Sequence, residues 1–161
     1  VDAAAGAAPG VLELAGFARD LTAEHIPAAA EAGIDLGFEG QGALPIRAEP
    51  LLLGEALRNL ISNAILHTGR DTVVTVRVAR DGDSALVAVE DDGPGIPQTA
   101  MPRAVSRFAR GNSAAPGMGL GLPVVDEIAR LFGGEVRLGP GPGARGLSVE
   151  LRFPLVAEAG P

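Results

Sequence analysis

Apolar and polar positions recur along the chain with two periods, one helical and one typical of strands. The strongest helical period covers residues 51–68, where apolar side chains recur at steps of three and four, at Leu53, Leu57, Leu60 and Ala64. Pro50 occupies a place suited to the first position of this helix, with Glu49 ahead of it. Gly69–Asp71 follows the run and predicts its end.

Two further helices are predicted on either side of this one. The first runs from Glu13 to about Ala32 and is expected to break or kink at Pro27. The second is opened by the glycine-rich run at 117–122 and continues to Phe132. Residues 97–116 show little periodicity and predict a long mobile loop.

Strand patterns fill the remaining chain. Residues 72–80 and 85–90 alternate apolar and polar positions around an Asp81-Gly82 turn, which predicts an antiparallel hairpin. Further strands are expected at 34–38, 44–48, 135–138 and 147–153, and residues 11–14 suit either a short strand or a helix start. Helices and mostly antiparallel strands in this order predict an α+β fold, a two-layer sandwich with helices on one face of the sheet.

Length and composition favour one domain. The chain has 161 residues, of which 47% are hydrophobic, enough for a single core. We expect the domain at 11–154, a linker or cloning remnant at 1–10 and a loose tail at 155–161. No apolar run is long enough to span a membrane.

Charge and residue usage exclude several function classes. The net charge of −7 and the absence of Trp and Tyr argue against nucleic-acid binding. Cysteine is absent, which excludes disulfides and thiol chemistry. All thirteen basic residues are arginines, so neither a lysine-based P-loop nor a lysine Schiff base is possible.

A line of polar residues marks the flank of the helix at 51–68. Asn59, Asn63 and His67 recur every four residues, beside the apolar stripe. Asparagine is a mediocre helix former, and its amide oxygen can accept a hydrogen bond or coordinate Mg²⁺. The pattern is compatible with a solvated helix flank and with a cation site.

The strand at 85–90 runs directly into Asp91-Asp92-Gly93-Pro94-Gly95. A carboxylate at a strand end can accept a hydrogen bond from an exocyclic amine, and the glycines allow a flat base to approach the backbone. An ordinary Asp-Gly-Pro turn is the alternative. Adjacent side chains on a strand point to opposite faces, so Asp91 and Asp92 are not expected to converge.

Downstream, a glycine run precedes a predicted helix. Gly117, Gly119 and Gly121 could present N–H groups to a triphosphate at the helix N-terminus, although a flexible linker would look the same. Arg107 and Arg110 lie in the preceding loop, where they are either solvated or available to a phosphate.

Taken together and in order, these motifs resemble the N, G1, F and G2 boxes of the catalytic, ATP-binding domain of sensor histidine kinases, within the wider family that includes gyrase, Hsp90 and MutL ATPases. The resemblance covers residues 11–154. It implies the Bergerat α/β sandwich, with ATP between the core helix and a lid.

The resemblance implies a role for each matching residue. Asn63 would hold Mg²⁺ between the phosphates with the assistance of Asn59, and these two are the expected catalytic residues. Asp91 would bind the adenine amino group, and Ser148 takes a place where the family often has a threonine near adenine. The expected nucleotide-binding set is Asn59, Asn63, His67, Asp91, Gly93, Gly95, Ile96, Arg107, Arg110, Gly117, Gly119, Leu120, Gly121, Leu122 and Ser148.

Some positions depart from the family pattern. Leu66 stands where many relatives have Lys or Arg, and the F box keeps only Phe108 of its aromatics. Asn59 replaces the glutamate with which gyrase-type relatives activate water, so hydrolysis should be slow and transfer favoured.

The resemblance therefore implies Mg-ATP as cofactor and transfer of the γ-phosphoryl group to a histidine on a separate dimerisation domain. Neither His25 nor His67 has the sequence context of such a phosphoacceptor. A response regulator would be the further partner, and the domain would be cytoplasmic, in a parent protein anchored in the inner membrane, without direct membrane contact of its own. A degenerate docking module of the same fold and an anti-sigma-type serine kinase are the alternatives.

Overall fold

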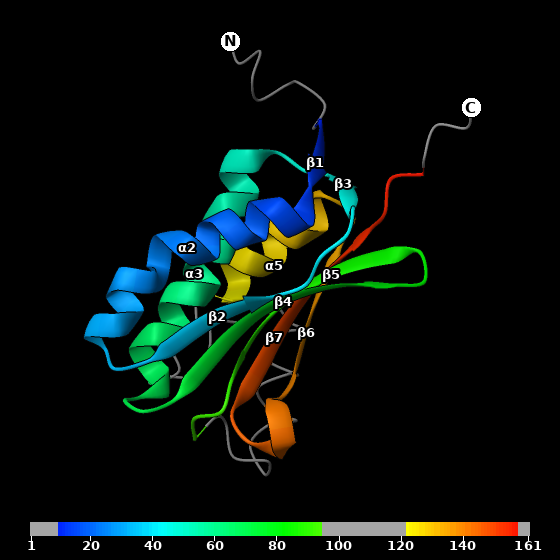
Figure 1. The fold of residues 1–161 in the computed structure, drawn as a ribbon. Helices are drawn as coiled ribbons and strands as arrows, with labels where there is room; N and C mark the ends of the chain where they lie inside the picture. The colour runs from blue at the N-terminus through cyan, green and yellow to red at the C-terminus, as the bar shows by residue number, and fades with distance from the viewer. Residues whose placement is uncertain (1–9, 95–121, 158–161) are drawn as a thin grey trace.

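The computed structural model describes residues 10–94 and 122–157, which form two layers (Figure 1). Three helices lie side by side on one face of a five-stranded sheet, as predicted. The strand order is β2-β4-β5-β7-β6, in which only the β2–β4 pair is parallel. The elements are β1 (Val11–Glu13), α2 (Leu14–Glu31), β2 (Asp35–Glu39), β3 (Pro45–Arg47), α3 (Pro50–Thr68), β4 (Val73–Asp81), β5 (Ser84–Asp91), α5 (Leu122–Leu131), β6 (Glu135–Pro140), η1 (Pro142–Ala144) and β7 (Leu147–Pro154).

Local capping signals set the bounds of α3. Pro50 is the first helical residue, and the carboxylate of Glu49 accepts a hydrogen bond from the Leu51 N–H at 2.6 Å. Gly69, with a φ of +101°, ends the helix in a conformation that glycine adopts readily. The predicted helix and its stop are therefore confirmed.

Helix α2 differs from the prediction at its interior proline. Pro27 lies within α2, and the helix continues for a further turn beyond it. Leu21 and Ala29, on either side of the proline, are both buried against the core. The packing of this buried face against the core maintains the helix at Pro27, where the absence of a backbone N–H would otherwise end it.

The two N-terminal strands form a small sheet of their own. β1 pairs antiparallel with β3, and Glu13 at its end accepts hydrogen bonds from the Ala15, Gly16 and Leu44 N–H groups. β3 corresponds to the strand predicted at 44–48, and its partner is β1 rather than a strand of the main sheet.

The region around β3 also holds both ends of the described chain. The Ala48 N–H donates to the Gly10 carbonyl at 3.2 Å, and the Val156 N–H donates to the Pro45 carbonyl at 2.8 Å. Gly10, at the end of the expected linker, and Val156, in the expected tail, thus form backbone hydrogen bonds with the fold.

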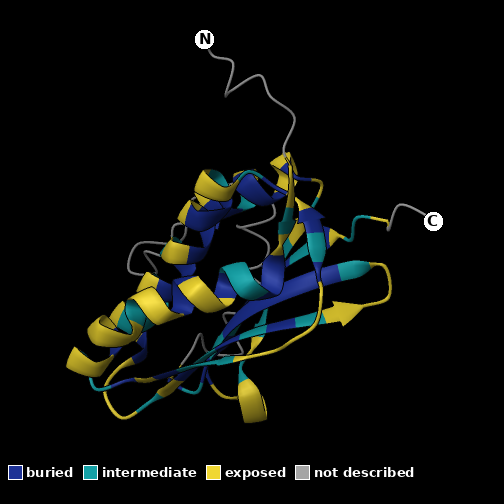
Figure 2. Ribbon diagram, turned by 45° about the horizontal axis from the view of Figure 1, so that its top comes forward, coloured by how far each residue is buried: buried dark blue, intermediate teal, exposed yellow. Residues whose placement is uncertain are grey.

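The core lies between the helices and the sheet (Figure 2). Its largest fully buried side chains include Leu14, Ile46, Leu53, Leu57, Ile61, Val74, Val87, Val125, Leu151 and Phe153. None of the helices in residues 10–94 and 122–157 is long and apolar enough to cross a membrane.

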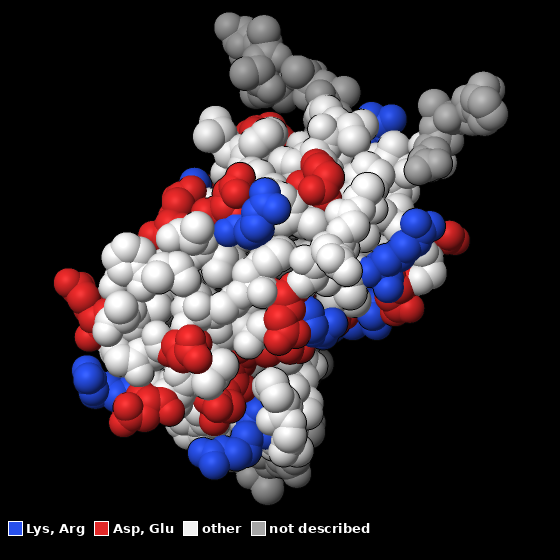
Figure 3. All heavy atoms as spheres, viewed as in Figure 1, with Lys and Arg blue, Asp and Glu red and all other residues white. Residues whose placement is uncertain are grey.

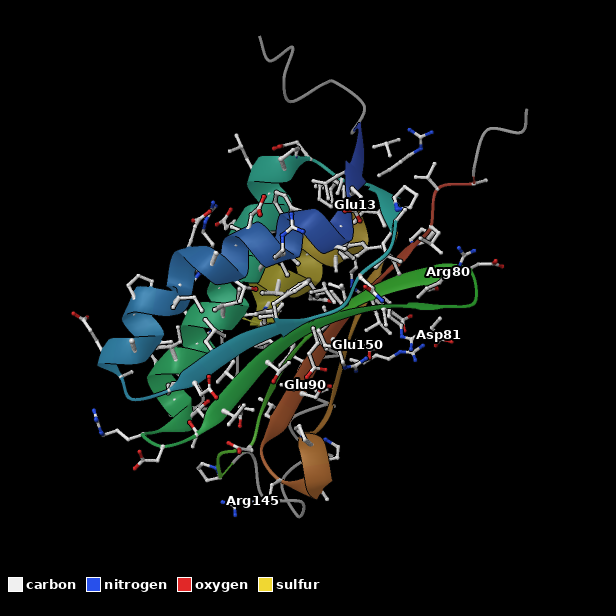
Figure 4. The ribbon with its side chains drawn as sticks, viewed as in Figure 1. Glu13, Arg80, Asp81, Glu90, Arg145 and Glu150 are labelled. Atoms are coloured by element: carbon white, nitrogen blue, oxygen red, sulfur yellow. The ribbon has the colours of Figure 1, made fainter. Side chains whose placement is uncertain are left out.

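The other face of the sheet is covered by paired charges. Arg77 on β4 contacts Glu90 on β5 at 3.0 Å, and Arg152 on β7 contacts both Glu150 and Asp81. Figure 4 labels the three acidic partners on the side of the sheet away from the helices. Arginine and acidic side chains lie intermixed on the surface in Figure 3.

Candidate functional site

The polar line on α3 is present in the structure. The Asn63 side-chain amide donates to the Asn59 amide oxygen at 2.8 Å, and both residues are half-buried. His67 and Leu66 are exposed near the end of the helix, with Leu66 74% exposed. The i,i+4 spacing thus brings the two asparagines together beside the apolar stripe, as expected.

Asp91 ends the central strand β5 and is nearly buried, with 9% of its surface exposed. One carboxylate oxygen, Oδ1, accepts the Gly93 N–H at 3.0 Å and the Leu147 N–H at 3.3 Å. Burial raises the pKa of the Asp91 carboxyl, and the bonds from Gly93 and Leu147 offset only part of that rise. Asp92 adds to the rise, whereas the Thr68 hydroxyl opposes it.

Glycines let the surrounding backbone approach this carboxylate closely. A Cβ on Gly146 would lie 1.9 Å from the Asp91 carbonyl oxygen, and one on Gly141 would lie 2.2 Å from it. Gly146 also has a φ of +73°, which disfavours any other residue. A Cβ on Gly93 would lie 2.8 Å from the Thr68 Cγ2. The turn between β6 and β7 and the end of α3 therefore enclose Asp91.

Asp92 points elsewhere, as the alternation of a strand requires. Its Oδ1 accepts the Val73 N–H at 2.8 Å, and its own N–H donates to the Val73 carbonyl at 3.2 Å. The two adjacent carboxylates therefore have different partners, and Asp92 fixes the turn to the start of β4.

The side chain of Ser148, which the resemblance places near adenine, lies on the face of β7 opposite to Leu147. Ser148 pairs with Glu90 across the β5–β7 ladder, and its hydroxyl donates to the Glu90 carboxylate at 3.4 Å. Side chains alternate along β7, so Ser148 faces the charged side of the sheet while Leu147 faces the core. It is the Leu147 N–H that contacts Asp91.

Leu122, the first residue of α5, is 3% exposed and belongs to the hydrophobic core. Its side chain is therefore a packing group, and only its backbone could face a ligand. The remaining predicted residues lie outside the described part of the chain: Gly95, Ile96, Arg107, Arg110, Gly117, Gly119, Leu120 and Gly121. The predicted loop at 97–116 lies outside it as well.

The sequence analysis missed four residues around Asp91 and Gly93, namely Thr68, Gly141, Gly146 and Leu147. Thr68 had a signal that could have found it, because it follows Ala64 by four residues and so continues the apolar stripe with a polar side chain. Gly146 and Leu147 are distant in sequence, and only the sheet register brings them to Asp91.

The described residues fit a purine nucleotide and a hard cation. A nearly buried carboxylate with glycine backbone around it suits the amino edge of a flat base. The amide pair on α3 suits Mg²⁺, which prefers oxygen ligands. Among the described residues, no group of three or more His, Cys, Asp or Glu side chains could hold a metal ion.

Comparison with known proteins agrees with this arrangement. Residues 48–157 match the family described as histidine kinase-, DNA gyrase B- and HSP90-like ATPases. The probable sensor histidine kinase TcrY of Mycobacterium tuberculosis is 34% identical over 126 residues, and the sensor protein IrlS of Burkholderia pseudomallei is 35% identical over 148 residues. These matches cover 71% and 89% of this chain, but only 26% and 31% of the two relatives. The chain thus spans less than a third of their length.

A solved structure shares the fold. The ATP binding domain of PrrB from Mycobacterium tuberculosis superposes with a TM-score of 0.72 at 23% identity, over 92% of this chain and 98% of that domain. The chain therefore belongs to the family of histidine kinase-, DNA gyrase B- and HSP90-like ATPases, and its relatives include the probable sensor histidine kinase TcrY.

Proposed function

We propose that this domain binds Mg-ATP and donates the γ-phosphoryl group to a histidine on a separate helical dimerisation domain. The observation that carries the proposal is the Asp91 carboxylate, nearly buried and enclosed by glycine backbone at a strand end. The homology to sensor histidine kinases supports the kinase activity. A response regulator would then receive the phosphoryl group from that histidine.

Each of the three described site residues has a distinct part in this proposal. Asp91 accepts a hydrogen bond from the 6-amino group of adenine and fixes the base. Asn63 would hold Mg²⁺ at the phosphates, with Asn59 held beside it by their hydrogen bond. The cation would neutralise charge on the phosphates during transfer.

Transfer requires positioning rather than a covalent intermediate on this chain. The bond from the γ-phosphorus to the leaving oxygen of ADP breaks as a bond to the acceptor imidazole nitrogen forms. Asn59 is an amide and cannot act as a carboxylate base toward water, so little hydrolysis should compete with transfer. The two amides and Asp91 supply orientation, which is the main requirement of this reaction.

Calorimetric titration of ATP, with and without Mg²⁺, tests the nucleotide site. We expect the Asp91→Ala variant to lose about 1.5–3 kcal/mol of binding free energy, roughly 10- to 150-fold in affinity, because a hydrogen bond to a charged acceptor is removed. The Asn63→Ala variant should instead lose the dependence on Mg²⁺. Asp20→Ala is the control, since Asp20 is an exposed acidic residue on α2.

The same titration can reject the proposal. If the wild type shows no heat of binding at millimolar ATP, the kinase function fails for this chain and a docking module of the same fold takes its place. Equal losses of ATP affinity in Asp91→Ala and Asp20→Ala would show that the base does not bind at Asp91.

A further inference from the structure

Asn59 and Asn63 form an amide pair on the flank of α3, one helical turn apart. Side chains on a helix lean toward its N-terminus, so the Asn63 side chain leans back over Asn59. The Asn63 Nδ2 group donates a hydrogen bond to the Asn59 Oδ1 atom at 2.8 Å, and both residues are half-buried. The contact therefore joins the two groups that the proposed function places at the phosphates, and it has a defined direction.

The direction of this hydrogen bond sets the orientation of the Asn63 amide. A side-chain amide has a nitrogen end that donates and an oxygen end that accepts. Because the nitrogen of Asn63 donates to Asn59, the Asn63 oxygen lies on the far side of the amide group, away from Asn59. Rotation of the Asn63 amide by half a turn would bring two oxygens together, which is unfavourable.

A magnesium ion is sensitive to the orientation of such an amide. Mg²⁺ binds oxygen ligands in a nearly ideal octahedron and tolerates little misplacement of them. An amide turned the other way would present N–H protons, which repel a cation. An Asn63 side chain that alternated between the two orientations would present its oxygen for only part of the time, and binding of the cation would be weaker.

The stability of α3 does not require this contact. Asparagine is a weaker helix former than leucine or alanine, and a hydrogen bond between side chains four residues apart contributes little to helix stability. Neither asparagine is fully buried, so neither would be left in the core without a partner. The orientation that the contact imposes on Asn63 is therefore a better explanation for the pair than folding.

We propose that Asn59 is a positioning residue, which holds the Asn63 amide with its oxygen toward Mg²⁺ without itself binding the cation. This inference rests on the proposed function, since it concerns the same Mg-ATP site. It extends that function because it assigns different tasks to the two amides. Asn63 binds the cation, and Asn59 acts only through Asn63.

The first test requires no nucleotide. NMR measures how fast the Asn63 side-chain N–H protons exchange with water in the wild type, Asn59→Leu and Asn59→Asp. A hydrogen bond slows this exchange. Leucine removes the acceptor, so exchange should become faster in Asn59→Leu. Aspartate has a similar shape and only accepts, so exchange should stay slow in Asn59→Asp if Asn63 is the donor.

Ser62→Leu provides the matched control. Ser62 is an exposed residue on the same helix, but it faces α2, where its hydroxyl lies 3.5 Å from the Nε2 atom of His25. Leucine there should change neither the exchange of the Asn63 protons nor the effect of Mg²⁺. Circular dichroism of all variants checks that each is folded, and Asn59→Leu should be no less helical than the wild type.

The second test compares the affinity for ATP with and without Mg²⁺ by calorimetry. The ratio of the two affinities measures the contribution of the cation. In Asn59→Leu this ratio should fall by about two- to tenfold, the usual effect of losing one neutral hydrogen bond. The fall should be smaller than in Asn63→Ala, and the affinity without Mg²⁺ should stay the same.

The outcomes separate this inference from the proposed function. If the wild type binds Mg-ATP but folded Asn59→Leu keeps either the slow exchange or the wild-type ratio, only the role of Asn59 is overturned. Fast exchange in Asn59→Asp overturns it too. A fall in Asn59→Leu as large as that in Asn63→Ala also overturns it, because Asn59 would then bind the cation itself. If the wild type binds no ATP, or binds it equally with and without Mg²⁺, the proposed Mg-ATP site and the role of Asn59 fail together.

Discussion

At the scale of single residues, Asp91 combines a proposed role in base binding with an environment that is unfavourable for its charge. The carboxyl is nearly buried, and burial raises its pKa because the ionised form loses its contact with water. Two backbone N–H groups and the Thr68 hydroxyl compensate only in part. A perturbed carboxyl in such a place is a candidate for a binding role, which is the role that the proposed function gives to Asp91.

The Asp91→Asn variant should therefore be more stable than the wild type at neutral pH. The pKa of Asp91 is higher in the folded than in the unfolded state. Its favourable contribution to the stability of the fold is therefore complete below the unfolded-state pKa and is lost as the pH rises through the folded-state pKa. Asparagine keeps an acceptor oxygen but carries no charge. The melting temperature of the Asp91→Asn variant should therefore exceed that of the wild type at pH 7.

Thermal unfolding of both proteins between pH 3 and pH 8 checks this expectation. The difference in melting temperature should shrink as the pH falls and Asp91 becomes protonated. A wild type that is the more stable of the two at pH 7 would contradict it. ATP titration of the same variant should show weakened binding.

Individual site residues could be predicted from the sequence where the signal is local. The spacing of Asn59 and Asn63 placed both amides on one flank, and the glycines after Asp91 marked a strand end. The strand neighbours of Ser148 could not be predicted, since they depend on a register that a single strand does not contain. The contact of Leu147 with Asp91 crosses 56 positions and is set by that register.

At the scale of elements, Glu13 ties the start of α2 to its surroundings. Its carboxylate accepts the Ala15 and Gly16 N–H groups at the helix N-terminus and the Leu44 N–H from the segment before β3. Burial by itself would raise the pKa of Glu13, but the three backbone hydrogen bonds and the charge of Arg19 outweigh it and lower the pKa. One side chain thus holds a helix and the small sheet together.

Replacement of Glu13 by alanine should destabilise the domain by about 1 kcal/mol at pH 7, the usual effect of losing an N-cap. Since the folded-state pKa of Glu13 is lowered, its contribution is present above the unfolded pKa and is lost as the pH falls through the folded value. Urea unfolding at pH 7 and near pH 3 measures both effects. Asp20→Ala should change stability little at either pH, and an equal effect of the two variants would contradict the prediction.

Helices and strands could be predicted from the sequence where the residues at their ends are typical of helix termini or turns. Glu49, Pro50 and Gly69 bound α3, and the Asp81-Gly82 turn with β-branched neighbours defined the central hairpin. Pro27 does not end α2, because the packing of a long helix against the core outweighs the effect of a single helix-breaking residue. The partner of β3 could not be found, since it lies in a strand of three residues that has no periodicity of its own.

At the scale of the whole molecule, the two faces of the sheet differ in the groups that cover them. One face is covered by the helices, and the other carries arginines that are already paired with neighbouring carboxylates. The site lies at the strand ends, where β5, the turn between β6 and β7 and the end of α3 meet. Access to a phosphoacceptor is thus expected at this end rather than across the sheet.

With γ-labelled ATP, the chain alone should acquire no phosphohistidine. His25 is held on α2 with its Nδ1 2.8 Å from the Leu21 carbonyl oxygen, and neither it nor His67 lies in a phosphoacceptor motif. Addition of a helical dimerisation domain with its histidine should transfer the label to that domain. Label retained on His67 in the absence of the added domain would contradict this expectation, and Asp91→Ala serves as the inactive control.

The ties at Gly10 and Val156 have a consequence for engineering. Both ends of the described chain are bound to the β3 region. The turn that holds η1 and Arg145 lies at the opposite end of the molecule (Figures 1 and 4), and the glycines of this turn approach Asp91. Chains whose ends lie close together tolerate circular permutation. A short peptide could therefore join the two ends and new termini could be opened in an exposed hairpin, with fluorescent reporters attached far from the nucleotide.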